Sequence, residues 1–216
     1  LIIGLLVGGA LAIAGAVMQG VFSNPLADPG IMGVSAGASL GAVIAIALGV
    51  TSLGMFYMPA FAFVGAFVSV GITILLTWRN NKLDTTTLLL AGVAVSMLLG
   101  AFTSGILTMI NEYRLREFLF WMVGGLDYRR WDHVLLAVGP IMTGSVILMM
   151  LGRHLNVLVL GDTEASALGL PVMVYRMLFL FLASVVTATA VCVSGSIGFV
   201  GLVVPHIVRI LVGPDH

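Results

Sequence analysis

The chain has 216 residues, of which 60% are hydrophobic and 8% are charged. Soluble globular domains carry roughly 25% charged residues, so this composition excludes a water-soluble fold. Nine Lys and Arg residues balance nine Asp and Glu residues, which removes the long-range attraction that would gather nucleic acid. The composition therefore predicts a protein that lives in a lipid bilayer and has no nucleic-acid partner.

Six apolar segments are long enough to cross a membrane, since a helix needs about 20 residues for a hydrocarbon core of about 30 Å. They are Leu1–Gln19, Gly30–Gly49, Tyr57–Trp78, Thr86–Ile110, His133–Leu151 and Pro171–Val193. A seventh apolar stretch, Ile197–Val212, is interrupted by glycines and by Pro205. We expect an all-α, polytopic helix bundle, with residues 1–216 as a single transmembrane domain. Because the chain opens at Leu1 inside an apolar segment, we also expect it to be a fragment of a longer protein.

Polar residues mark the breaks between these segments. Asp28 precedes Pro29, and Asp84 precedes a run of three threonines, so each carboxylate is placed to cap a helix. The longest polar stretch, Asn111–Asp132, mixes arginines with aromatic residues and predicts an interfacial helix with an aromatic belt. Counting cations on alternate loops does not orient the chain. Arg79, Lys82, Arg153 and Arg176 fall on one side, and Arg114, Arg116, Arg129 and Arg130 fall on the other.

Small residues recur at every fourth position in three of the predicted spans. The series are Gly4, Gly8, Ala12, Ala16 and Gly20; then Gly33, Gly37, Gly41, Ala45 and Gly49; then Gly92, Ser96, Gly100 and Ser104. Such grooves let helix backbones approach closely, which favours helices packed against protein rather than lipid. They support a compact bundle of any function.

A fainter regularity links the two ends of the chain at an offset of 180 residues. Gly15 is followed ten positions later by Pro25, and Gly195 is followed ten positions later by Pro205. Two oppositely oriented copies, as in an inverted-repeat transporter, would explain this spacing. Chance matches in a glycine-rich chain explain it equally well.

Several kinds of chemistry are missing from the sequence. No phosphate-binding G-x-x-x-x-G-K-[ST] loop occurs, so ATP-driven work would need a separate ATPase. The histidines lack the spacing and companions of a metal site, and we expect no metal and no cofactor. None of the six predicted spans holds an Asp or Glu, which disfavours an ion-coupled carrier.

Three motifs carry a resemblance to a known family. They are Gly15-Ala-Val-Met-Gln19 leading to Asn24-Pro-Leu-Ala-Asp-Pro29 and Gly33-Val-Ser-Ala-Gly-Ala38, then Phe120-Trp-Met-Val-Gly-Gly125, and then Gly195-Ser-Ile-Gly-Phe-Val-Gly-Leu-Val-Val-Pro-His-Ile-Val-Arg209. Together they resemble the FecCD-type permeases, the membrane subunits of ABC importers for iron-siderophores, haem and cobalamin. The resemblance implies an ABC type II importer permease fold of ten spans, of which this chain would hold about six and lack the first and the last three.

The resemblance also implies a location, an orientation and partners. The chain would be a multi-pass protein of the bacterial plasma (inner) membrane, joined to a second permease subunit, a cytoplasmic ABC ATPase dimer and an extracytoplasmic substrate-binding protein. Residues 22–29, 79–84 and 152–170 would face the cytoplasm, and residues 111–132 the exterior. The chain itself would not be an enzyme, because ATP hydrolysis would belong to the partner.

Three groups of residues take roles from the resemblance. The segment docking into the ATPase would hold Gly161, Asp162, Thr163, Glu164, Ala165, Leu168 and Gly169. The gate and path would hold Asn24, Pro25, Leu26, Thr86, Thr87, Ser96, Gly100 and Ser104. Arg114, Arg116, Arg129 and Arg130 would meet acidic residues of the binding protein. Asp162 is expected to cap a short helix that ends at Gly169 and Pro171.

A purely structural role stays open for each of these three groups of residues. The docking segment could be an ordinary connecting helix, the path residues could only pack helices, and the arginines could only anchor an aromatic helix at headgroups. The preferred function is the permease of an ATP-driven importer of metal chelates. An ion-coupled secondary carrier and a structural membrane scaffold are the other candidates. The sequence leaves open which chelate or corrinoid is carried, whether the dimer is homomeric, and whether the fragment folds as in the longer protein.

Overall fold

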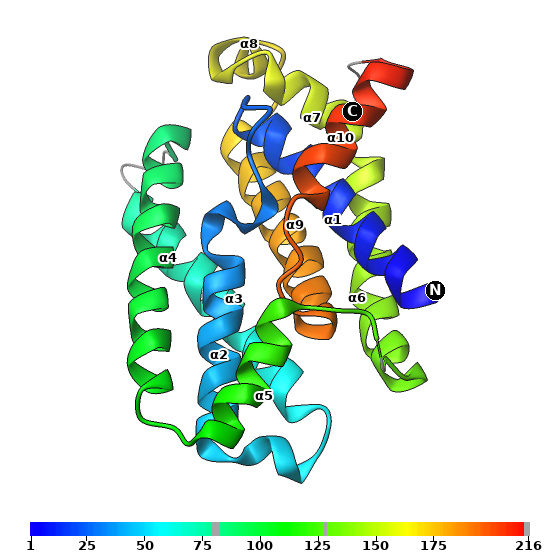
Figure 1. The fold of residues 1–216 in the computed structure, drawn as a ribbon. Coiled ribbons are helices and arrows are strands. Elements are labelled where there is room, and N and C mark those ends of the chain that lie inside the picture. Colours follow the sequence, from blue (N-terminus) through cyan, green and yellow to red (C-terminus); the bar gives the residue numbers. More distant parts are fainter. Residues whose placement is uncertain (79–82, 128, 214–216) are drawn as a thin grey trace.

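The computed structural model describes residues 1–78, 83–127 and 129–213, and every regular element within these ranges is helical (Figure 1). The α-helices are α1 (Ile2–Val21), α2 (Val34–Leu48), α3 (Tyr57–Thr77), α4 (Thr85–Leu107), α5 (Glu112–Val123), α6 (Trp131–Met150), α7 (Gly152–Val159), α8 (Asp162–Ala167), α9 (Val172–Ser194) and α10 (Val200–Val212). Two 3₁₀ turns, η1 (Pro29–Met32) and η2 (Val50–Leu53), flank α2. The all-α prediction is confirmed.

Among the described residues, five helices are long and apolar enough to cross a membrane: α1, α3, α4, α6 and α9. The second predicted span, Gly30–Gly49, is shorter than expected, because α2 has 15 residues and begins only at Val34. The Asp28 side chain accepts a hydrogen bond from the Gly30 N–H at 2.7 Å and starts a 3₁₀ turn instead. Gly33 then takes a left-handed φ of +82°, which breaks the helix before α2 begins.

Both predicted caps are confirmed. Asp28 caps η1 with Pro29 at the first position of the turn. Asp84 caps α4, because its carboxylate accepts the backbone N–H of Thr87 at 2.7 Å.

Helix α9 forms the centre of the bundle, with 78% of its most apolar stretch buried, against 50% for α1 and 22% for α4. Close backbone contacts at glycines surround it. A Cβ on Gly15 would overlap the carbonyl oxygen of Gly201, and one on Gly41 would overlap that of Phe61. Gly41 belongs to the small-residue series of α2, which therefore does bring helix backbones together, as the sequence predicts. Gly15 lies outside the series of α1, whose own glycines, Gly4, Gly8 and Gly20, face either side chains or open space among the described residues.

The series on α4 behaves differently. Gly92 packs so closely against η1 that a Cβ would overlap the carbonyl oxygen of Ile31. A Cβ on Gly100 would meet nothing within 4 Å among the described residues. The expectation that this series packs along its whole length is wrong within this chain, and the second half of α4 presents an open face.

Helices α1 and α10 run in the same direction, side by side. Gly201, near the start of α10, lies against Leu11 and Gly15, while Arg209, near its end, donates a hydrogen bond to the Oε1 atom of Gln19. Figure 1 shows the same course, with α1 and α10 both ascending towards α7 and α8. The 180-residue offset pairs α1 with residues 182–201, most of which lie in α9, and does not pair it with α10. The parallel course of α1 and α10 therefore leaves the inverted-repeat interpretation a prediction.

We predict that Gly15→Ala lowers the melting temperature of the purified protein in detergent. The added methyl group has no room beside the Gly201 carbonyl, and overpacking of this kind costs roughly 1–3 kcal/mol. Gly8→Ala, on the same helix, is the matched control because its Cβ would meet nothing within 4 Å. An equal loss of stability in both variants would contradict the close α1–α10 contact.

Candidate coupling segment and gate

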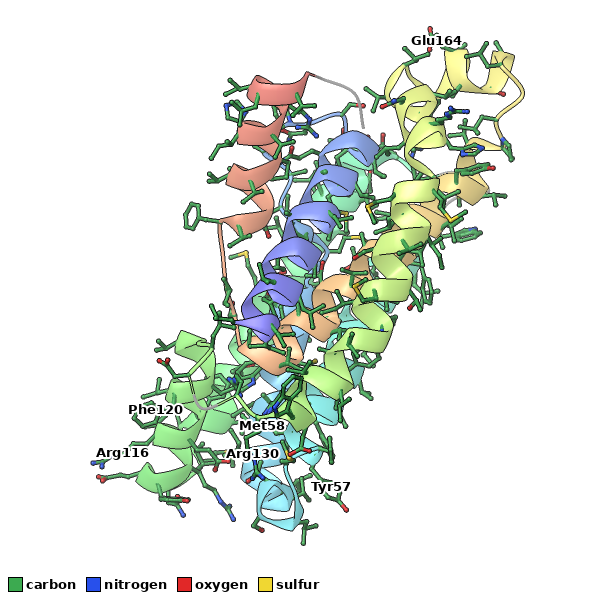
Figure 2. All side chains as sticks on the ribbon, turned by 90° about the vertical axis from the view of Figure 1, so that its right-hand side faces the viewer. Tyr57, Met58, Arg116, Phe120, Arg130 and Glu164 are labelled. Carbon is green, nitrogen blue, oxygen red and sulfur yellow. The ribbon has the colours of Figure 1, made fainter. Side chains whose placement is uncertain are left out.

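The predicted functional groups lie at opposite ends of the molecule. Figure 2 shows Glu164 at one end and Arg116, Phe120 and Arg130 at the other. The loop after α1, the start of α4 and helices α7 and α8 share the Glu164 end (Figure 1). Arg79 and Lys82 lie outside the described residues. Of the four cations predicted on this side of the membrane, the structure therefore describes Arg153 and Arg176.

The predicted docking segment folds as the short helix α8 with a glycine at each end. Gly161 precedes it with φ +113°, and Gly169 follows it with φ +83°. The Leu170 N–H donates to the Ala165 carbonyl at 3.0 Å and the Gly169 N–H to that of Ser166 at 2.9 Å, which is a Schellman ending. Ala165 is fully buried and fastens the helix, while Leu168 is 67% exposed and projects from it.

Asp162 does not cap this helix, which corrects the sequence prediction. The cap position is Gly161, and no side chain caps the helix. The Asp162 carboxylate instead binds the guanidinium of Arg176, in the first turn of α9, through both of its oxygens. From the sequence, Arg176 is noticeable only as one of four cations on one side of the membrane. The signal was its place inside an apolar span, where a cation needs a partner.

The predicted gate residues form two turns at the same end. The Asn24 side chain accepts the Leu26 N–H at 2.9 Å, and this local turn leaves Pro25 and Leu26 exposed. Thr86 and Thr87 are exposed in the first turn of α4.

The hydroxyl of Thr87 is engaged by the cap of α4. It donates a hydrogen bond to the Asp84 carboxylate at 2.6 Å. The hydrogen bonds from the hydroxyl and then from the backbone N–H of Thr87 hold the pKa of Asp84 below its ordinary value. The carboxylate of Asp84 therefore stays ionised and fixes the first turn of the helix that carries the predicted path.

Along α4 the predicted path residues differ in environment. The half-buried Ser96 donates its hydroxyl hydrogen to the Gly92 carbonyl at 2.7 Å, one turn back on its own helix. Ser104 is exposed, and Gly100 faces open space. The outer half of α4 thus offers small groups on an open face, while Ser96 stands at the boundary with the packed half.

The four predicted docking arginines divide into two pairs. Arg114 donates from Nη1 to the Ala47 carbonyl at 2.9 Å, near the end of α2. Arg129 donates from Nε to the Gly125 carbonyl at 3.2 Å, and burial lowers its pKa. Arg116 is exposed, and Arg130 lies 3.8 Å from Asp132 in an exposed pair. The first two arginines hold the fold, and the last two are presented to a partner or to lipid headgroups.

The predicted interfacial helix is only partly interfacial. Phe118 and Trp121 are buried, whereas Phe120 is 81% exposed. The end of α5 turns inward, since the Gly125 N–H donates to the Ser194 carbonyl at 2.8 Å and a Cβ on Gly195 would overlap the Trp121 carbonyl. Half of the expected aromatic belt therefore packs against the bundle.

The bundle, with its five apolar spans and its short polar helix at one end, has the architecture of a polytopic membrane protein. Residues 1–216 match the model of the FecCD transport family over their whole length, and the chain belongs to that family.

Characterised relatives and a solved structure agree with this assignment. The chain is 47% identical over its full length to "Cobalamin import system permease protein BtuC" of Halobacterium salinarum, of which it covers 58%. It is 40% identical to "Hemin transport system permease protein HmuU" of Yersinia pestis, of which it covers 65%. A solved structure described as "An inward-facing conformation of a putative metal-chelate type ABC transporter" superposes with a TM-score of 0.93 at 33% identity, over 99% of this chain and 68% of that one. The chain thus spans about 58–65% of the length of these two relatives.

We predict that Arg114→Gln destabilises the protein, while Arg116→Gln leaves its melting temperature unchanged. Arg114 ties α5 to the end of α2 through a half-buried, charge-assisted hydrogen bond, worth roughly 1.5–3 kcal/mol. Arg116 is the matched control, two residues away on the same helix and exposed. Thermal unfolding in detergent measures both, and equal melting temperatures for the two variants would contradict the division of the arginines.

Proposed function

We propose that this chain is the core of the permease subunit of an ATP-driven importer for metal chelates such as iron-siderophores, haem or cobalamin. Its partners would be a second permease subunit, a cytoplasmic ABC ATPase dimer and an extracytoplasmic binding protein. The family membership supports transport, and the printed names of the relatives, cobalamin and hemin import permeases, support this substrate class. The chain performs no covalent chemistry in this scheme.

One observation carries the proposal: the docking segment and the gate residues lie at the same end of the bundle, opposite the exposed arginines (Figures 1 and 2). An ATPase that binds α8 would act directly beside the turns that hold Asn24 and Thr87. A binding protein would meet Arg116 and Arg130 at the far end. Rim charges of this kind steer encounter and set the docking register.

The open half of α4 supports a path shared with a second permease. Exposed apolar residues such as Met97 and Phe102 surround the small residues there. A smooth wall of small groups lets a bulky ligand pass without strong contacts. Asn24, Pro25, Leu26, Thr86 and Thr87 would narrow the inner end of this path, and Ser96, Gly100 and Ser104 would line it.

The first prediction of this proposal separates it from a secondary carrier. Proteoliposomes holding the assembled importer should take up chelate only when ATP is supplied, and uptake should survive collapse of the ion gradients. The described spans favour this result, because their one carboxylate, Asp132, lies in the first turn of α6 and is partly exposed. Uptake that needs an ion gradient and not ATP would favour the carrier, and a complete lack of flux would favour the scaffold.

The second prediction concerns the docking segment. Leu168→Glu should uncouple ATP hydrolysis from uptake, because it places a charge on the apolar side chain that α8 projects most openly. The fold should tolerate the change, since this side chain is 67% exposed. Met109→Glu, at an exposed position at the other end of α4, is the control and should leave coupling intact. Parallel assays of ATP hydrolysis and uptake would measure the amount of chelate taken up per ATP hydrolysed. An unchanged value in Leu168→Glu would reject the docking role.

A further inference from the structure

A single buried guanidinium joins the docking segment to the start of the gate helix. Arg176 is 6% exposed, and its Nη1 atom donates both to the Asp162 carboxylate at 3.0 Å and to the Leu83 carbonyl at 3.1 Å. Its Nη2 atom donates to the other oxygen of the same carboxylate. Arginine is suited to this position because its planar fork holds two acceptors in fixed directions at once.

The three segments joined in this way are far apart in sequence. Arg176 stands on α9, the most buried span, whereas Asp162 opens α8 and Leu83 precedes α4. Leu83 is itself 3% exposed, so its carbonyl is held firmly against the bundle. The guanidinium is therefore a fixed point on the core to which both the docking segment and the gate helix are fastened.

The connection continues from Leu83 to the gate. The next residue, Asp84, accepts both the N–H and the hydroxyl of Thr87. One guanidinium, one peptide group and one carboxylate thus separate Asp162 from the side chain of Thr87. A cleft of about 560 Å³, lined by Leu83, Asp84, Asp162, Ser166, Met173 and Arg176 among others, lies along this route and leaves room for α8 to move.

We propose that Arg176 is a positioning residue that transmits displacement of the docking segment to the first turn of α4. When the ATPase shifts α8, the bidentate pair carries the shift to Arg176, and the bond to the Leu83 carbonyl carries it on to Asp84 and Thr87. The inference rests on the proposed function, because it assigns a mechanical route between two sites of that function. The Nε atom of Arg176 is buried and makes no hydrogen bond among the described residues, so the guanidinium keeps one donor for a second arrangement.

The choice of variant follows from the burial of the two partners. Replacing Asp162 by an apolar residue leaves a buried cation without its side-chain acceptor, which is strongly destabilising, whereas Asp162→Asn keeps one amide oxygen that can accept a hydrogen bond from the guanidinium. Replacing Arg176 by Met instead leaves the Asp162 side chain, which is 60% exposed and can be solvated by water. Arg176→Met and Arg176→Lys are therefore the main variants. Lysine keeps the charge but lacks the planar fork that holds carboxylate and carbonyl together. The control is Arg153→Met, an exposed arginine on α7 at the same end.

The experiment uses the assembled importer in proteoliposomes, with a spin label on Leu90→Cys, an exposed position near the start of α4 that lies outside the predicted gate residues. Both Arg176 variants should keep ATP hydrolysis but lose uptake per ATP by about tenfold, the effect of losing one charge-assisted hydrogen bond. The label should respond to nucleotide in the parent and in Arg153→Met, and it should not respond in Arg176→Met. A purely structural role would lower assembly without removing this response from the complexes that form.

The possible results distinguish failure of the proposed importer function from failure of the route through Arg176. If the labelled parent shows no ATP-driven uptake, the proposed function fails. If the parent transports and the Arg176 variants keep both their uptake per ATP and the response of the label, only the route through Arg176 is overturned. If both Arg176 variants fail to assemble, Asp162→Asn decides, because it keeps the shape of the side chain and removes its charge. Reduced uptake per ATP in that variant supports the route, and normal coupling overturns it.

Discussion

Close approach of helix backbones at glycine is the constraint on which this structure depends. In lipid, apolar side chains gain nothing by leaving their surroundings, so helices are held together by dispersion across short backbone separations. The contacts of Gly15 with Gly201 and of Gly41 with Phe61 provide those separations. They join α1 to α10 and α2 to α3, and the most buried span of the bundle, α9, carries Arg176. The hydrogen bonds of Arg176 to Asp162 and Leu83 therefore depend on the packing of apolar helices.

The same constraint explains where polar side chains occur inside the bundle. Gln19 is 3% exposed and donates to the carbonyls of Gly201 and Leu202, at the first turn of α10. It also accepts a hydrogen bond from Arg209. Pro205 has no N–H to donate to the Gly201 carbonyl four residues before it, so this acceptor needs a side-chain donor within the hydrocarbon, and Gln19 supplies it. Gln19 thus fastens α10 to α1, as Arg176 fastens α8 and the residue before α4 to α9.

The sequence predicts features that depend on local chemistry. The apolar spans, the caps at Asp28 and Asp84, and the ending of α8 at Gly169 each follow from residues within a few positions of one another. Features that depend on distant residues were missed. The pair of Asp162 with Arg176 crosses 14 positions, and the bond from Arg176 to Leu83 crosses 93. No local pattern could indicate these partners.

The errors at α2 and α5 have the same origin. Apolar composition continues across Gly30–Met32, so hydropathy alone extends the span, while the Asp28 turn and the left-handed Gly33 end it. Around α5, aromatic residues suit a headgroup region and a protein core equally well. The tertiary contacts of Phe118 and Trp121 decide between the two environments, and the sequence of α5 does not.

The segment from Gly195 to Phe199 has a consequence for biosynthesis. This stretch connects α9 to α10 without helical structure, and Gly201 meets α1 at Gly15, well inside the length of that span. Peptide groups without hydrogen-bond partners at such a depth are costly in lipid. Here the segment that follows α5 provides one partner, because the Gly125 N–H donates a hydrogen bond to the Ser194 carbonyl. Helices α1 and α5 both precede α9 in the chain, so they are already in the membrane when the α9–α10 hairpin leaves the insertion machinery. The order of synthesis therefore supplies the covering helices before the segment that needs them emerges from the ribosome.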